Sequence, residues 1–319
     1  MSNLHNRFIR GKHNLRADAR GSVVTIGSYD GLHLGHQAIM KQVCEKSQEL
    51  GLPSVAMVFE PHPHEYFSAE SAPARLMTFR EKVLAFCTAG IDRVCCLSFN
   101  EALRSLTAEE FVRQILVQGL NIKFLVVGDD FRFGRDRSGD YEYLHKAGEK
   151  WGYQVADTRT FEIDGERVSS TRIRKTLEDA DFALAARLLG KPYTLSGRVA
   201  FGQQLGQRLG VPTANVHLRR YRSPLQGVFA VRARLSDGRL INGVANVGVR
   251  PTINAVTKPI LEVHLLDFDE NIYGQRLVVE FVQKLRAERK FESVDLLREQ
   301  IFADIDAARA YFSAEPDPR

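Results

Sequence analysis

The sequence predicts an α/β domain followed by a β domain: a parallel sheet covered by helices, then an antiparallel barrel with a terminal helix. Strand and helix patterns alternate through the first half, which is typical of parallel sheets with helices on both faces. Short β-branched and aromatic runs, separated by glycines, recur in the second half and favour a closed or nearly closed barrel. A length of 319 residues also exceeds one typical domain.

The first predicted strand, residues 23–26, leads into a glycine-rich turn and then a helix that Gly51 closes. Two later helices each begin at a threonine followed three residues on by a glutamate, a capping-box pattern. The elements that follow are a strand over 55–59, a helix from Thr78 through Phe86, a strand over 93–99, a helix over 111–117 behind Thr107 and Glu110, and a strand over 124–127. Ligands bind beyond the carboxyl ends of such strands, so we expect the turns 27–36 and 128–134 at one crevice.

The second half opens with a helical connector over residues 176–190. Asp237-Gly238 is a strong hairpin signal within a series of four predicted strands, over 228–235, 240–244, 260–266 and 276–281. Ser293 fits the N-cap of a last helix whose apolar stripe predicts a packing face: Val294, Leu297, Ile301, Ile305, Ala308 and Phe312. We therefore expect a first domain over residues 1–186 and a second over 187–319.

The composition is that of an ordinary globular protein, with 44% hydrophobic and 26% charged residues. No long apolar run or apolar leader is present, so the sequence predicts a cytoplasmic protein without a membrane span. The four cysteines lack CxxC spacing and are expected to be reduced core thiols rather than disulfides or zinc ligands. A net charge of +5 favours anionic partners without choosing between nucleotides and nucleic acids.

The segment GSYDGLHLGH, residues 27–36, carries the strongest functional signal. A glycine turn between a strand and a helix points backbone N–H groups and the positive end of the helix dipole at one spot, which attracts phosphate. His33 and His36 add ring donors suited to charge developing on a departing phosphate. A histidine or a glycine turn alone is ordinary, but this combination in this order indicates a nucleotide-handling site.

A second segment, RVSSTRIR at residues 167–174, places three hydroxyl groups and two arginines at the start of a helical pattern. Hydroxyl and guanidinium groups can hold polyphosphate oxygens at a helix N-terminus. The alternative is an N-cap followed by solvated charges.

GSYDGLHLGHQ, VVGDDFRFG and RVSSTRIR together resemble the adenylyltransferase module of the prokaryotic bifunctional riboflavin kinase/FAD synthetase family, within the HxGH nucleotidyltransferase class. In the second half, GQRLGVPTANV, SPLQGVFAV, ANVGVRPT, LEVHLLDF and LRAERKFES resemble the riboflavin kinase module of that family. HxGH alone indicates only the nucleotidyltransferase superfamily. PTAN followed by the other kinase segments is specific for this family. The resemblance implies a Rossmann-like first domain, a barrel-shaped kinase domain, and synthesis of FMN and then FAD.

In adenylyl transfer the FMN phosphate attacks the α-phosphorus of ATP, so the enzyme supplies positioning and charge stabilisation rather than a nucleophile. The resemblance implies that His33 and His36 bind ATP phosphates and stabilise the transition state. The other implied ATP contacts are Gly27, Ser28, Asp30, Ser169, Ser170, Thr171 and Arg172, with Arg172 also assigned to catalysis. The implied flavin contacts are Asp129, Asp130, Phe131 and Arg132; the alternative is an acidic turn with Phe131 and Phe133 in the core.

Riboflavin phosphorylation needs a proton acceptor, because the attacking primary hydroxyl is neutral. Glu262 fits, since an unpaired carboxylate in the apolar strand 261–266 would be costly without a purpose, and strand alternation puts His264 on the same face. A plain sheet-surface glutamate is the alternative, and Asp267 is the second choice of base. The resemblance implies that Thr213 and Asn215 bind Mg²⁺-ATP, that Gly202, Gly206 and Gly210 form a phosphate loop, and that Glu262 and Arg286 face the flavin.

The expected ligands are ATP, riboflavin, FMN and FAD, with Mg²⁺, or Mn²⁺ in its place, as the metal. We expect a monomer or weak homo-oligomer without nucleic-acid or membrane partners. Three positions depart from the family pattern: Tyr29 replaces a usual phenylalanine, Gln207 a frequent arginine and Ala180 a frequent glycine. Two other classes stay open, a single-activity enzyme with one decayed module and a flavin- or RNA-binding protein without turnover.

Overall fold

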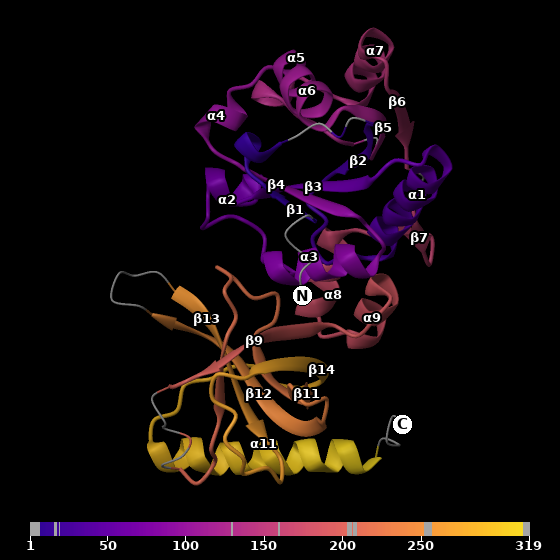
Figure 1. The fold of residues 1–319 in the computed structure, drawn as a ribbon. Coiled ribbons are helices and arrows are strands. Elements are labelled where there is room, and N and C mark those ends of the chain that lie inside the picture. The colour runs from indigo at the N-terminus through magenta and orange to yellow at the C-terminus, as the bar shows by residue number, and fades with distance from the viewer. Residues whose placement is uncertain are drawn as a thin grey trace. The chain divides into compact units, whose positions relative to one another are not determined.

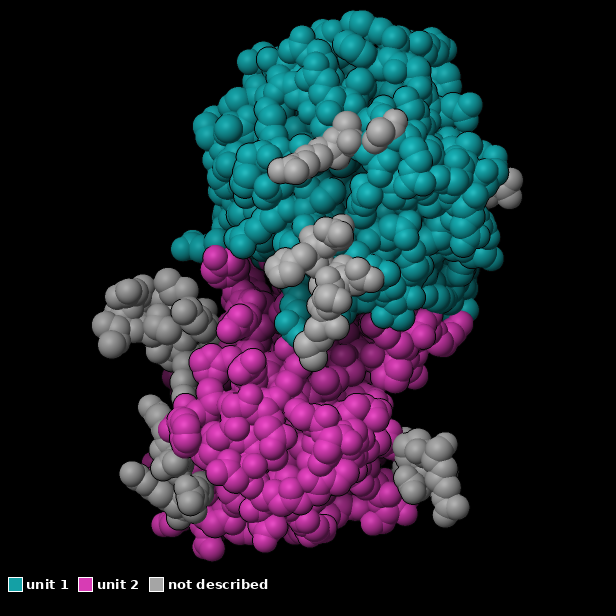
Figure 2. Space-filling view, in the orientation of Figure 1, with its two compact units in different colours: residues 1–73, 79–169 teal, residues 74–78, 170–319 magenta. Residues whose placement is uncertain are grey.

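The structure is a computed structural model and describes residues 7–15, 18, 20–128, 130–158, 160–202, 206, 209–251 and 257–314. The chain forms two compact units, which Figure 2 distinguishes by colour. Unit 1 comprises residues 1–73 and 79–169, and unit 2 comprises residues 74–78 and 170–319. The predicted boundary after residue 186 falls inside α9 (Phe182–Leu189), and a functional division at that residue stays a prediction.

Unit 1 is built on a six-stranded sheet in the order β1-β4-β3-β2-β5-β6, with parallel pairing throughout, as predicted (Figure 1). Its strands are β1 (Phe8–Arg10), β2 (Ser22–Ile26), β3 (Ser54–Glu60), β4 (Arg93–Ser98), β5 (Ile122–Val127) and β6 (Gln154–Asp157). In the sheet, β2 lies between β3, the next strand along the chain, and β5, to which the chain returns later. The region beyond the carboxyl ends of β2 and β5 is therefore a topological switch point, where ligands bind in such sheets.

Two of the predicted start and stop signals in unit 1 are confirmed. Gly51 ends α1 in the left-handed conformation, and Thr107 and Glu110 form the predicted capping box. The helical elements are α1 (Leu34–Leu50), α2 (Pro63–Phe67), α3 (Phe79–Thr88), α4 (Glu101–Arg104), α5 (Ala108–Phe111), the π-helix Val112–Val117, α6 (Gln118–Leu120), α7 (Tyr141–Trp151) and the 3-10 helices Lys12–Asn14 and Arg135–Arg137. A short hairpin of β7 (Glu162–Ile163) and β8 (Glu166–Arg167) completes the unit.

Unit 2 contains the predicted antiparallel barrel, closed in the order β10-β13-β12-β11-β14-β9. The strands are β9 (Thr194–Ala200), β10 (Ala214–His217), β11 (Gly227–Arg234), β12 (Leu240–Pro251), β13 (Thr257–Leu265) and β14 (Arg276–Arg286). The predicted hairpin at Asp237-Gly238 joins β11 to β12, and Gly238 has a φ of 94°, which favours glycine.

The last helix, α11 (Val294–Ala314), packs along the outside of the barrel (Figure 1). Ile305 and Ala308 contact the outer face of β11 and β12, so the predicted packing stripe is confirmed there. Ser293 accepts a hydrogen bond from the Leu296 N–H at 3.2 Å, as expected of an N-cap. The prediction was wrong for Val294, which is 57% exposed because it precedes the part of the helix that reaches the barrel.

The connector predicted as one helix is two, α8 (Ser170–Glu178) and α9. The break lies at Ala180, whose φ of 58° is left-handed, a conformation that glycine adopts without strain. Asp181 then caps α9 by accepting from the Leu184 N–H at 2.9 Å. In the part of the chain described here, no helix is both long and apolar enough to cross a membrane.

Candidate active sites

The glycine turn of unit 1 leaves the carboxyl end of β2 in a tightly packed conformation. A Cβ on Gly27 would lie 2.8 Å from the ring of Tyr29, whose own φ is left-handed at 48°. The Tyr29 hydroxyl donates to Thr25 Oγ1 at 2.5 Å, and Thr25 donates to the Val126 carbonyl at 2.7 Å. The hydroxyl that separates Tyr29 from phenylalanine therefore has a partner, and burial raises its pKa.

The two predicted histidines lie face to face at the start of α1. His33 is the N-cap, its Nδ1 accepts from the His36 N–H at 3.4 Å, and the two rings stack with centroids 3.6 Å apart. A Cβ on Gly35 would already lie 3.3 Å from the His33 ring, which explains the small residue there. The His36 Nδ1 is buried and has no hydrogen-bond partner among the described residues. A buried nitrogen of this kind is suited to receiving a ligand atom.

Both imidazoles are held neutral. Burial lowers the pKa of His33 to about 4, with Arg167 acting in the same direction and Asp30 opposing. Burial also lowers the pKa of His36 well below its usual value, helped by His33, Lys82 and Arg167. Each ring therefore offers one donor and one acceptor at neutral pH. The fixed positive charge near the histidines comes from the lysine and the arginine instead.

Lys82 and Arg167 supply that charge from different elements. Lys82, on α3, is 5% exposed and donates from Nζ to the Ser28 carbonyl at 2.5 Å. Arg167, at the end of β8, forms an ion pair with Asp130 at 3.1 Å. The adjacent parallel strands and this pair confirm that the turns 27–36 and 128–134 lie at one edge. Sequence analysis missed Lys82, although its position four residues before the buried Phe86 puts it on the core-facing side of its helix.

The segment 128–134 divides between core and surface. Phe133 is buried against Phe111, which confirms the core alternative for this residue. Phe131 is half-buried and stacks on Phe133 with centroids 5.6 Å apart, while Arg132 is exposed. Asp129 lies outside the described residues.

An aromatic group that sequence analysis missed lies beyond the carboxyl ends of β3 and β4. Phe67 is 64% exposed and packs with Tyr66 and Phe99, and the Arg104 guanidinium lies 5.7 Å from its ring centroid. His62 caps α2, the short helix that carries Tyr66 and Phe67. Burial and, to a smaller extent, Lys82 lower the pKa of His62 to about 4. The signal was the run PHPHEYF, residues 61–67, directly after β3.

The SSTR segment crosses the boundary of the units. Ser169 is the last residue of unit 1, and Ser170 begins α8 in unit 2, which confirms the predicted helix start. Thr171 is exposed, and the Arg174 Nε donates to the Ala74 carbonyl at 2.6 Å within unit 2. A joint phosphate site of Ser169, Ser170, Thr171 and Arg172 with the histidines stays a prediction.

In unit 2 the predicted glycine loop packs directly on the predicted metal ligands. A Cβ on Gly202 would lie 2.3 Å from the Asn215 amide, and a Cβ on Gly206 would lie 3.0 Å from Thr213 Oγ1. Gly210 has a φ of 81°. Glycines are therefore required by close approach at two positions and by backbone conformation at the third. A hydroxyl and an amide oxygen are hard ligands of the kind that Mg²⁺ accepts, so this cradle fits the predicted metal. Gln207 lies outside the described residues.

Glu262 lies on the outer face of the barrel, in the middle of β13. Its neighbours in the strand are fully buried, whereas Glu262 is half-buried. It pairs directly with Asn215 on β10 and with Asn246 on β12. His264 shares its face, as predicted, and its Nδ1 donates to the Pro212 carbonyl at 2.8 Å. β13 thereby brings the carboxylate beside the PTAN segment.

The two remaining kinase candidates are engaged by other side chains. Asp267 lies exposed beyond the end of β13, where Arg309 binds both carboxylate oxygens and lowers the pKa. Arg286 makes three contacts of 2.8–3.1 Å with the buried Asp304 of α11. Within the described residues no group of three or more His, Cys, Asp or Glu side chains could hold a metal ion.

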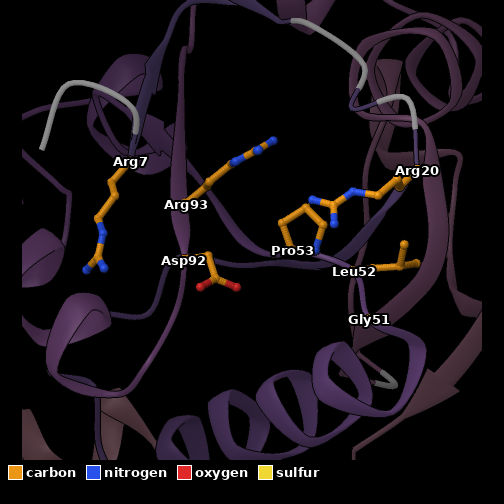
Figure 3. Close-up of a pocket in the computed structure, with 7 residues that line it drawn as sticks. All are labelled: Arg7, Arg20, Gly51, Leu52, Pro53, Asp92 and Arg93. Atoms are coloured by element: carbon orange, nitrogen blue, oxygen red, sulfur yellow. The ribbon is translucent and has the colours of Figure 1, made fainter. Parts of the chain in front are cut away.

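A cavity of about 430 Å³ lies in unit 1 near the amino ends of the strands (Figure 3). Its lining residues are Arg7, Arg20, Gly51, Leu52, Pro53, Asp92 and Arg93. Asp18 pairs with both Arg20 and Arg93, at 3.5 and 3.0 Å, and Asp92 accepts from the Ser54 N–H at 2.9 Å. Arg20, Arg93 and Asp92 thus have partners within the protein, and the cavity lies at the opposite end of the strands from the histidines.

Comparison with known proteins matches the two halves to two families. The FAD synthetase family model covers residues 15–172, and the riboflavin kinase family model covers residues 189–312. Among relatives named bifunctional riboflavin kinase/FMN adenylyltransferase, that of Pseudomonas fluorescens is 53% identical, over 95% of this chain and 97% of that protein. The Haemophilus influenzae relative is 46% identical, over 97% and 100%, and the Escherichia coli K12 relative is 45% identical, over 96% and 98%.

Among solved structures, one described as a macrolide-efflux protein from Streptococcus pneumoniae matches with a TM-score of 0.77 and 29% identity. The match covers 95% of this chain and 98% of that chain. The fold, the two family models and the full-length relatives agree: the chain belongs to the bifunctional riboflavin kinase/FMN adenylyltransferase family.

Proposed function

We propose that the two reactions of this family are divided between the two units. Unit 2 phosphorylates riboflavin with ATP to give FMN and ADP, and unit 1 adenylylates FMN with a second ATP to give FAD and pyrophosphate. The observation that carries this division is that one chain holds two chemically opposite sites: neutral stacked histidines at a glycine turn, and a carboxylate between two amides. The first suits a nucleophile that is already ionised, and the second suits one that must lose a proton.

In the adenylyltransferase site, an FMN phosphate oxygen bonds to the α-phosphorus of ATP, and the bond from that phosphorus to the bridging oxygen breaks. Pyrophosphate leaves with the bonding electrons, so negative charge builds on its oxygens. His33 and His36 donate hydrogen bonds to these oxygens, and Lys82 and Arg167 offset the charge. Gly27, Ser28 and Asp30 shape the turn, and Ser169, Ser170, Thr171 and Arg172 hold the polyphosphate.

The flavin end of FMN occupies the same edge of unit 1. Asp129, Asp130, Phe131 and Arg132 contact it in this proposal. The exposed Phe67 adds an aromatic surface, since a flat conjugated ring gains dispersion energy against other rings.

In the kinase site, Glu262 accepts the proton of the riboflavin primary hydroxyl as the hydroxyl oxygen attacks the γ-phosphorus of ATP. The bond from that phosphorus to the oxygen bridging it to the β-phosphorus breaks, and ADP leaves with the bonding electrons. Thr213 and Asn215 would hold Mg²⁺, and the loop of Gly202, Gly206 and Gly210 holds the phosphates. When bound, the metal offsets charge on the transferred phosphoryl group. Glu262 is preferred to Asp267 because strand pairing puts Glu262 beside Asn215 of the PTAN segment, whereas Asp267 lies exposed beyond the end of β13. Arg286 takes part at the flavin end of this site.

We further propose that the protein works in the cytoplasm, with Mg²⁺ or Mn²⁺ as the metal. Its partners are its substrates and products rather than nucleic acid or membrane, and it acts as a monomer or weak homo-oligomer. The four free cysteines support a reducing compartment.

The test is a chromatographic time course of purified protein with riboflavin, ATP and Mg²⁺, following FMN, FAD, ADP and pyrophosphate. FMN should appear first and FAD second, with ADP matching the first step and pyrophosphate the second. FMN without FAD would indicate a kinase with a silent first unit. No product at all would favour a binding protein without turnover.

A further inference from the structure

We infer that Asn246 binds the ribityl chain of riboflavin and aligns its terminal hydroxyl with Glu262. The inference rests on the proposed kinase function of unit 2. Asn246 lies within the segment ANVGVRPT, whose residues have no assigned role in the site described above.

The strand register places three polar side chains in one row across the barrel. Asn215 on β10 pairs with Glu262 on β13, and Glu262 pairs with Asn246 on β12. Directly paired residues point to the same face, with Cβ atoms about 4.5–5.5 Å apart. All three are half-buried, whereas Ala245 and Val247, which flank Asn246 in its strand, have no exposed surface. The row is therefore a polar line on the outer face of the barrel, and the apolar residues that flank Asn246 point to the inner face.

The in-line geometry of phosphoryl transfer assigns different roles to the two ends of this row. In phosphoryl transfer the attacking oxygen and the departing ADP lie on opposite sides of the γ-phosphorus. The predicted phosphate loop packs on Asn215 and Thr213, so the nucleotide lies on the β10 side of Glu262. The acceptor hydroxyl must then reach Glu262 from the β12 side, where Asn246 is its nearest polar neighbour in the row.

The surroundings of Asn246 suit a polyol chain. The Asn246 amide has a carbonyl acceptor and an NH₂ donor, which can bind neighbouring hydroxyl groups of the chain. On β11, Val228 pairs with Asn246 and gives the row an apolar end. Farther along β12, Gly248 approaches Glu288 so closely that a Cβ would lie 2.3 Å from Oε1. Glu288 also accepts from the Gln226 Nε2 at 3.2 Å. The side chain of Glu288 thus lies beside the row, against the residue two positions from Asn246 along β12.

The test compares Asn246→Ala with Asn242→Ala in steady-state FMN formation by the full chain. Asn242 is a matched control because it shares the strand and the face but pairs with Arg232, away from Glu262. We expect Asn246→Ala to raise the KM for riboflavin by about 10- to 100-fold, the effect of removing a substrate hydrogen bond. The KM for ATP and FAD formation from supplied FMN should stay unchanged, and Asn246→Ser should recover part of the loss.

Inhibition by lumiflavin, which has the flavin ring but no ribityl chain, separates a ribityl contact from a general disturbance. Its inhibition constant should be the same in Asn246→Ala and the parent protein. An unchanged riboflavin KM, an equal rise in the ATP KM, or an equal loss of lumiflavin binding would each overturn the inference. A lower kcat with a shifted pH profile and an unchanged KM would also overturn it, since Asn246 would then only orient Glu262. Full FMN formation by Glu262→Gln, measured in parallel, would instead refute the proposed base.

Discussion

The two sites of this chain differ in how deeply they are buried. The histidines of unit 1 are enclosed, with His33 5% exposed and the His36 Nδ1 buried, whereas Glu262 lies half-exposed on the outside of a barrel. Burial suits neutral imidazoles that only donate hydrogen bonds. The same burial would raise the pKa of a carboxylate and leave it protonated, unable to accept the riboflavin proton. Each site therefore has the exposure that its proposed chemistry requires.

The sites also differ in how the fold assembles them. In unit 1 a parallel sheet brings turns from separate strands to one edge, and the side chains come from β2, α1, α3 and β8. In unit 2 the antiparallel register itself puts Asn215, Glu262 and Asn246 in line. The first site depends on loop conformations, and the second depends on strand pairing.

The largest effect is expected from removing the proposed base of the half-exposed site in unit 2. Glu262→Gln should lower kcat for FMN formation by about 10²- to 10⁴-fold, because the amide cannot accept the hydroxyl proton. FAD formation from supplied FMN should be unchanged, as measured by separate assays of the two steps. Asp267→Asn is the control and should keep FMN formation; an equal loss in both assays by Glu262→Gln would refute separate sites.

The opposite result, loss of FAD formation with FMN formation kept, tests the enclosed site of unit 1. His36→Asn should lower FAD formation by about 10²- to 10³-fold, since a donor to the developing pyrophosphate charge is displaced. FMN formation from riboflavin should survive. His145→Asn, an exposed histidine on α7 of the same unit, should behave like the parent protein. Unchanged FAD formation in folded His36→Asn would contradict the assignment.

The buried ion pair between Arg286 and Asp304 allows the stability of the two units to be compared. Asp304→Ala leaves the half-buried Arg286 guanidinium uncompensated and should lower the free energy of unfolding of unit 2 by about 3 kcal/mol. Urea unfolding followed by circular dichroism measures this. The fluorescence transition of Trp151, the single tryptophan, reports unit 1 and should not move. Asp267→Ala, which breaks an exposed pair with Arg309, should have little effect, and similar losses in the two variants would count against the role of burial.

The smallest expected effect is a pH dependence of unit 1. Folding lowers the pKa of His33 and of His62 to about 4, and that of His36 well below its usual value. Between about pH 6.5 and 4 the unfolded chain therefore binds protons that the folded chain does not, and the free energy of unfolding falls as the pH falls. Denaturation followed by Trp151 at pH 7 and pH 5 should show this decrease. His36→Asn should reduce it, and an identical decrease in the variant would rule out this histidine as a cause.

The sequence alone was sufficient for elements whose signals are local, whereas β1, β6, β9, β10 and α7 were not predicted. The capping box at Thr107, the left-handed Gly51 and the hairpin at Asp237-Gly238 each involve residues a few positions apart. The motif residues of both sites were also predicted, since glycine turns and strand alternation are short-range patterns. The connector prediction failed at Ala180, where one residue in the left-handed conformation separates two helices.

The amino-acid sequence by itself determined the alternation of strands and helices, the barrel and the identity of the residues carried by the motifs. Only the tertiary structure decided which other groups face them. Lys82 donates to the Ser28 carbonyl, 54 residues away in the sequence. Arg286 at the end of β14 donates to Asp304 on α11. Asn246 stands beside Glu262 only through strand register. Such contacts depend on the packing of distant segments, and no short-range pattern of side chains encodes them.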